Sequence, residues 1–103
     1  MSNQQPKEPP KVKPEDAKFE LGSIYTTPGA FDAMQGPEMF WFLRRHLACD
    51  WGNCCEQDAQ ANNDALEHGG RIISIYYAKS GAKLWVITEA DRSSTTILLP
   101  SEY

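Results

Sequence analysis

Apolar and polar positions alternate along the last third of the chain, from Arg71 to Tyr103. A period of two predicts β-strands, because successive side chains of a strand point to opposite faces. Two breaks divide this region, the dipeptide Ser80-Gly81 and the charged stretch 89–93. The pattern therefore predicts three antiparallel strands, the first two joined by a two-residue hairpin loop at Ser80-Gly81.

The position of this loop predicts which residues face each other across the strands. A loop at Ser80-Gly81 places Ile75 opposite Val86, and the next connection places Thr88 opposite Thr95. Side chains that alternate in this register share one face, and the more apolar set is expected to lie against the core. That set comprises Ile73, Ile75, Tyr77, Leu84, Val86, Ile97 and Leu99.

The opposite face is also largely apolar, which is unusual for a solvent-facing sheet surface. It carries Ile72, Ser74, Tyr76, Trp85, Ile87, Thr96 and Leu98. Two interpretations remain open. The N-terminal segment or a bent loop covers this face, or Tyr76, Trp85 and Leu98 form a surface for a protein partner or for a homodimer.

The middle of the chain predicts a strand followed by three helices. Residues 19–26 form the expected first strand, with a bend at Gly22, and Thr27-Pro28 has the composition of a helix start. Helices are expected over 28–34, over 37–49, and from Asn53 to Gly69-Gly70. The order β-α-α-α-β-β-β predicts an α+β domain, with helices packed on one face of an antiparallel sheet.

The N-terminal 18 residues differ in composition from the rest. Four prolines and four lysines occur there, and Val12 is nearly the only apolar side chain. Such a segment cannot offset its ordering entropy, so residues 1–18 are predicted to be a disordered tail and residues 19–103 a single domain. The sequence has no membrane-length apolar run and no apolar signal core, and its three cysteines are an odd number. These features predict a cytoplasmic protein without structural disulfides.

Negative charge is concentrated in the domain. The tail carries four basic and three acidic residues, whereas residues 19–103 carry six basic and eleven acidic ones. Broad binding to nucleic-acid backbones needs a basic surface and is therefore disfavoured. Asp58, Asp64 and Glu67, in a stretch without Lys or Arg, are candidate contacts to a protein partner, although an ordinary solvated helix face has the same composition.

One group of polar residues has the composition of a metal-independent nuclease site. Its members are His46, Asp50, Arg71, Glu89, Arg92 and Thr95. A carboxylate beside an imidazole can orient a general base, and an arginine can hold a phosphate. The same residues also suit turns and helix ends, so catalysis is the alternative hypothesis. No cofactor is expected, and no metal site is assigned, because the sequence has no Cys-x2-Cys pair.

Several short motifs resemble those of a known group of proteins. They are Asp50-Trp51-Gly52, Gly70-Arg71, Trp85, the run 87–93, Thr95-Thr96, Leu99-Pro100 and Glu102-Tyr103. In these motifs, residues 19–103 resemble short bacterial proteins of plasmids and other mobile elements, labelled plasmid-related protein or type I restriction endonuclease subunit M. The methyltransferase activity in the second label needs a doubly wound domain and an Asn/Asp-Pro-Pro-aromatic motif, which this chain lacks. The resemblance implies an accessory protein that inhibits or modulates a host-defence or nucleic-acid-handling complex.

Overall fold

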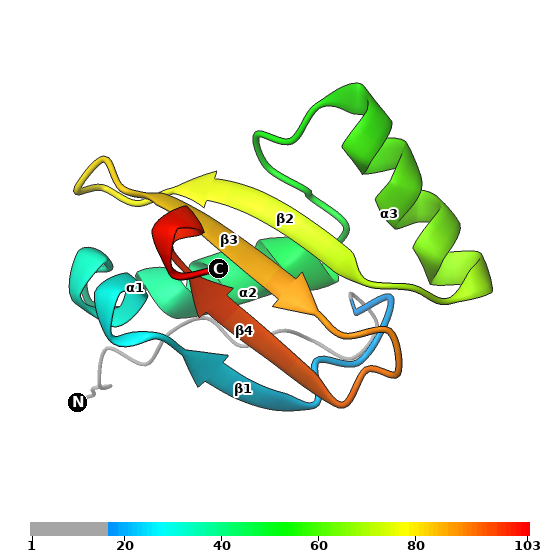
Figure 1. The fold of residues 1–103 in the computed structure, drawn as a ribbon, viewed down its shortest axis with the longest axis horizontal. Coiled ribbons are helices and arrows are strands. Elements are labelled where there is room, and N and C mark those ends of the chain that lie inside the picture. The colour runs from blue at the N-terminus through cyan, green and yellow to red at the C-terminus, as the bar shows by residue number, and fades with distance from the viewer. Residues whose placement is uncertain (1–16) are drawn as a thin grey trace, which may run out of the picture.

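The structure, a computed structural model, describes residues 17–103. The predicted tail therefore lies, up to residue 16, outside the described residues. Figure 1 shows a four-stranded sheet with helices around it. The elements, in chain order, are β1 (Ser23–Thr26), α1 (Pro28–Ala33), α2 (Glu38–Leu47), α3 (Glu56–His68), β2 (Ile72–Tyr77), β3 (Lys83–Thr88), β4 (Ser94–Leu98) and the 3-10 helix η2 (Pro100–Glu102).

The α+β class and the predicted order of strands and helices are confirmed. The strands lie in the order β1-β4-β3-β2, so the first strand joins the sheet beside the last one. β2, β3 and β4 form the predicted antiparallel meander, whereas β1 runs parallel to β4. The sheet is therefore mixed, and β1 and β2 form its two edges (Figure 1).

The register of the first hairpin differs from the prediction by one residue. Ile75 lies opposite Trp85 rather than Val86. The connecting loop has three residues, because the amide of Ala78 donates to the carbonyl of Ala82 at 2.9 Å and Gly81 adopts a φ of 94°. Contacts from the helices hold this loop: Lys79 donates its amide to a Glu38 carboxylate oxygen at 2.8 Å.

This shift exchanges the two faces of β2. Tyr76 is fully buried on the same face as Leu84 and Val86, together with Ile72 and Ser74. Ile73, Ile75 and Tyr77 instead lie on the face of Trp85. The predicted surface of Tyr76, Trp85 and Leu98 is thus wrong, because Tyr76 belongs to the core and Leu98 is only 6% exposed. The predicted pair Thr88–Thr95 is confirmed, and in the same register Val86 lies opposite Ile97.

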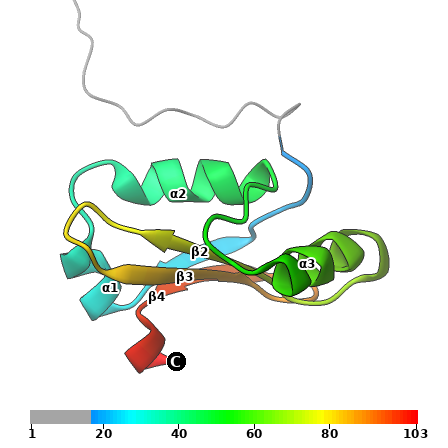
Figure 2. The same cartoon turned by 90° about the horizontal axis from the view of Figure 1, so that it is seen from above.

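Only α2, among the described helices, lies across a face of the sheet (Figure 2). Phe42 and Leu43 of α2 pack with Tyr76, Val86 and other sheet residues in the main core cluster. η2 lies on the opposite side of the sheet and α3 lies beside β2 (Figure 2), so the helices do not share one face. No helix within residues 17–103 is long and apolar enough to span a bilayer.

The helix starts agree with the sequence in one case and differ in another. Thr27 caps α1, and its hydroxyl accepts a hydrogen bond from the amide of Ala30. α3 begins at Glu56, after Cys55, rather than after Asn53. The amide of Asn53 donates instead to the carbonyl of Ile75, so this segment lies against the edge of β2.

Candidate functional site

His46, the predicted general base, lies in the interior. Its side chain is fully buried between α2 and the sheet, and its ring packs edge-on against Phe19 and Trp51. Nδ1 lies 2.5 Å from the hydroxyl of Ser74, and Nε2 lies 2.9 Å from the hydroxyl of Thr88. Both ring nitrogens are therefore occupied, and no substrate can reach them in this structure.

The hydroxyls beyond His46 determine its protonation. Thr95 donates its only hydroxyl proton to the carbonyl of Leu21, at 2.8 Å, so it must accept from Thr88 at 2.7 Å. Thr88 then has no proton left for the imidazole, so Nε2 of His46 is the donor and Nδ1 accepts from Ser74. Burial, and secondarily the charge of Arg92, lowers the pKa of His46 to about 3, so the ring is neutral.

Asp50 does not orient His46. Its carboxylate accepts from Nε of Arg45 at 2.7 Å and from the amide of Gly52 at 3.2 Å. The hydrogen bond from Arg45 lowers the pKa of Asp50. The sequence spacing placed Asp50 near the end of α2, and the structure assigns it to the turn that follows.

Arg92 has a structural role. Its guanidinium donates to the carbonyls of Gly70 at 2.6 Å, Ala65 at 3.0 Å, Glu89 at 3.1 Å and Ala90 at 3.2 Å. These contacts join the end of α3 to the turn before β4. All printed hydrogen bonds of Arg92 within the described residues go to carbonyls, and its guanidinium also lies over the ring of Phe19, so the protein itself engages the arginine that was predicted to bind phosphate.

Of the six nuclease candidates, Arg71 and Glu89 come together at the surface. Nε of Arg71 lies 3.4 Å from the Glu89 carboxylate, and Nη1 donates to the hydroxyl of Tyr103 at 2.9 Å. Tyr103 also packs edge-on against Trp85, with ring centroids 5.3 Å apart. The convergence predicted for the full set is not present, since His46 and Thr95 are buried.

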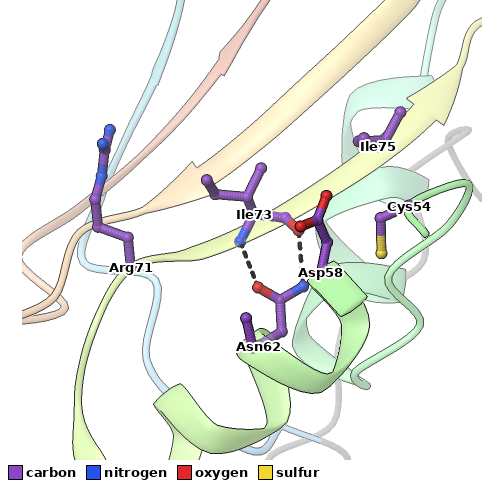
Figure 3. A pocket seen from close by; sticks show the side chains of 7 residues that line it. Cys54, Asp58, Asn62, Arg71, Ile73 and Ile75 are labelled. Atoms are coloured by element: carbon purple, nitrogen blue, oxygen red, sulfur yellow. Dashed lines mark hydrogen bonds between the residues drawn. The ribbon is translucent and has the colours of Figure 1, made fainter. Parts of the chain in front are cut away.

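A pocket of about 160 Å³ lies between α3 and β2. Its lining comprises Cys54, Asp58, Ala61, Asn62, Arg71, Ile73 and Ile75 (Figure 3). Ile73 and Ile75 supply an apolar floor, Asp58 stands on the α3 side, and Arg71 marks the far end (Figure 3). Burial, and secondarily the Asp58 carboxylate, raises the pKa of the Cys54 thiol, so that this cysteine stays protonated at neutral pH.

Apolar side chains continue from the pocket across the face of the sheet opposite α2. We call this surface the open-face patch; it comprises Ile73, Ile75, Tyr77, Trp85 and Tyr103. Tyr77 is 52% exposed and Tyr103 67% exposed, and the other three are half-buried. An apolar patch beside a pocket with two charged groups has the features expected of a binding site.

The sequence predicted only part of this site. Asp58 lines the pocket, whereas Asp64 bonds Gln60 and Glu67 lies beside His68, both on exposed positions of α3. Trp85 belongs to the open-face patch as predicted. Ile73, Ile75 and Tyr77 were assigned to the core, and a three-residue loop ending at Gly81 is the sequence signal that would have placed them correctly.

The His, Cys, Asp and Glu side chains that could bind a metal do not form a cluster in the described part of the chain. Within residues 17–103 no three His, Cys, Asp or Glu side chains lie close enough together to hold a metal ion. Cys49, Cys54 and Cys55 are free thiols. Comparison of the chain with protein-family models, with curated proteins and with solved structures finds no match. The site geometry therefore carries the functional argument.

Proposed function

We propose that this chain is a non-enzymatic accessory protein of a mobile genetic element. It binds a protein partner, one per chain, through the open-face patch and the pocket beside it. The observation that carries this proposal is the continuous apolar surface that leads from Tyr77 to a pocket with the carboxylate of Asp58 at its side. Exposed apolar surface of this kind is typical of protein interfaces.

The charges around the pocket indicate the chemistry of the partner. Arg71 is already paired with Glu89 and Tyr103. Asp58 has no ion pair or hydrogen bond from its side chain within residues 17–103, and it stands beside the apolar floor of Ile73 and Ile75. A lysine or arginine of the partner suits this pocket, because its alkyl stem can lie on the isoleucines while its charge meets Asp58.

The resemblance to mobile-element proteins supports a biological role for binding such a partner. Such an element benefits from a small protein that inhibits or modulates a host-defence or nucleic-acid-handling complex. The acidic domain favours a basic partner and disfavours direct binding to nucleic-acid backbones. The nuclease alternative receives less support, since both ring nitrogens of His46 are hydrogen-bonded in the interior and Arg92 donates to four carbonyls.

The test is a quantitative pull-down from bacterial lysate, with and without nuclease treatment. We expect a nuclease-resistant partner that is lost with Asp58→Lys and with Tyr77→Ser. Asp64→Lys is the matched control, because it makes the same charge change on α3 at a position that does not line the pocket. Equal loss of the partner with Asp64→Lys would mean that binding depends on the overall charge of the protein and not on the pocket. Recovery of RNA, or no partner in either sample, contradicts the proposal.

A further inference from the structure

The two edges of the sheet differ in whether their outward backbone groups have hydrogen-bond partners. Along β2, the segment Trp51–Asn53 forms a bridge to Ile75, and the amide group of Asn62 bonds both the amide and the carbonyl of Ile73. Among residues 17–103, β1, at the other edge, pairs with β4 alone. Figure 1 shows no other described element along its outer side. An open edge is a template for another strand, and proteins usually block it.

The ladder between β1 and β4 shows which backbone groups of β1 are free. The amide of Ser23 donates to the carbonyl of Ser93, just before β4, and the amide of Thr27 donates to the carbonyl of Ile97 in β4, at 3.0 Å each. Alternate residues of a strand direct their backbone groups to opposite sides. The amides and carbonyls of Ile24 and Thr26 therefore point outward, away from β4.

The side chains of β1 do not prevent another strand from pairing with this edge. Ile24 is 47% exposed and Tyr25 57% exposed. The strand has the sequence Ser-Ile-Tyr-Thr, with no charge, no proline and no bulge within it. Lysine, proline and bulges are the usual means of preventing edge-to-edge pairing, and β1 has none of them.

We propose that β1 pairs antiparallel with β1 of a second copy of this chain, with a two-fold axis at Tyr25. This register places Ile24 of each copy opposite Thr26 of the other. Both residues have outward backbone groups, so each pair makes two hydrogen bonds and the interface makes four. Tyr25 then faces its own symmetry mate on the open-face side, next to Thr96 in the parallel register.

Self-pairing is favoured over an unrelated strand because β1 complements itself. A two-fold axis at Tyr25 brings no like charges together within the strand, since all four side chains are neutral. The two sheets join into one of eight strands. Four residues a side form a small contact, so the dissociation constant of the dimer is expected to be roughly micromolar or higher.

The experiment is sedimentation velocity on the full chain over a concentration series, with charge variants at the two-fold axis. Tyr25→Lys and Tyr25→Glu each place like charges opposite one another, so each is expected to remain monomeric where the wild type dimerises. An equimolar mixture of the two variants restores the dimer, because opposite charges now face each other. Dimerisation of either single variant at wild-type concentrations overturns the proposal.

A second measurement tests the register. Ile24→Pro removes an outward amide without touching the ladder to β4, and it loses two hydrogen bonds per dimer, which raises the dissociation constant about thirtyfold. Ile24→Val is the matched control and keeps wild-type association. Amide exchange at Ile24 and Thr26 must slow as the protein concentration rises. A wild type that stays monomeric, or a dimer with both amides unprotected, contradicts the proposal.

Discussion

His46 Nε2 and Thr88 Oγ1 lie 2.9 Å apart inside the domain, and the proton between them belongs to the imidazole. The ring joins α2 to the sheet, because its other nitrogen accepts from Ser74 of β2. A neutral histidine with both nitrogens satisfied is a structural link. The residue that looked most like a catalytic base in the sequence therefore contributes to folding.

The buried histidine predicts a loss of stability in mild acid. The pKa of His46 is about 3 in the folded state against 6.5 for an ordinary histidine, so the unfolded chain binds more protons between these values. The free energy of unfolding then falls as the pH drops below about 6.5, by up to ~1.4 kcal/mol per pH unit from this group. Urea unfolding at pH 7, 6 and 5 measures this slope.

The control for this prediction is His46→Gln, which keeps one donor and one acceptor but does not titrate. It is expected to lower stability at pH 7 by about 1–3 kcal/mol and to flatten the slope between pH 7 and 5. A variant with the wild-type slope would assign the acid sensitivity to other groups.

Arg92 is expected to be critical for stability. Arg92→Ala leaves the carbonyls of Ala65 and Gly70 without their guanidinium partner. A hydrogen bond to a charged group contributes about 1.5–3 kcal/mol to stability, and the contributions of neighbouring bonds do not simply add. We expect a loss of about 2–4 kcal/mol in thermal or urea unfolding. Arg44→Ala, in the last turn of α2, removes no side-chain hydrogen bond or ion pair found within residues 17–103 and should change stability by less than about 0.5 kcal/mol. Equal effects would contradict the role assigned to Arg92.

Gly52 lies too close to β2 to tolerate a side chain. A Cβ at this position would lie 1.9 Å from the carbonyl oxygen of Ile75, and the φ angle is 76°. Gly52→Ala is expected to cost about 3 kcal/mol or more, because both backbones must move apart. Gly36→Ala is the matched control, since Gly36 also has a positive φ, 52°, but nothing within 4 Å of a Cβ. Thermal unfolding of both variants, followed by circular dichroism, measures the two losses of stability. The excess loss in Gly52→Ala over Gly36→Ala is the contribution of the steric clash.

Asn62 substitutes for a neighbouring strand along β2. Its side chain accepts from the amide of Ile73 at 3.0 Å and donates to the carbonyl of Ile73 at 2.8 Å. Asn62→Ala is expected to destabilise the domain by about 1–3 kcal/mol and to accelerate hydrogen exchange of the Ile73 amide. Gln60→Ala, at an exposed position of α3, should leave that amide protected.

The sequence predicted those parts of the fold that depend on local chemistry. Thr27-Pro28 starts α1 as its composition predicts, and the pairing of Thr88 with Thr95 follows from the strand pattern. The first hairpin was predicted one residue out of register, because its loop is held by Glu38, whose position depends on tertiary packing. Gly81 suits the end of a three-residue loop as well as a two-residue loop, whereas the contact with Glu38 that holds the three-residue loop cannot be seen in a local pattern.

The same distinction applies to the candidate site. Asp58 and Trp85 were predicted as binding residues from charge and from aromatic character; Asp58 lines the pocket and Trp85 belongs to the open-face patch, and their binding role stays a prediction. Because of the error in register, Tyr76 was predicted at the surface, and Ile73 and Ile75 were predicted in the core. The burial of His46 depends on hydroxyls contributed by β2 and β3, far away in sequence, so spacing alone could not reveal it.

The parallel pairing of β1 with β4 has a consequence for synthesis. Ser23 pairs with Ser94, so about 70 residues must be translated between the two before the ladder can form. The β2–β3–β4 meander, made of neighbours in sequence, can assemble first, and β1 docks onto it last. On the ribosome, β1 emerges early and β4 is translated late, so the nascent chain carries the uncharged strand β1 without β4 through most of its elongation.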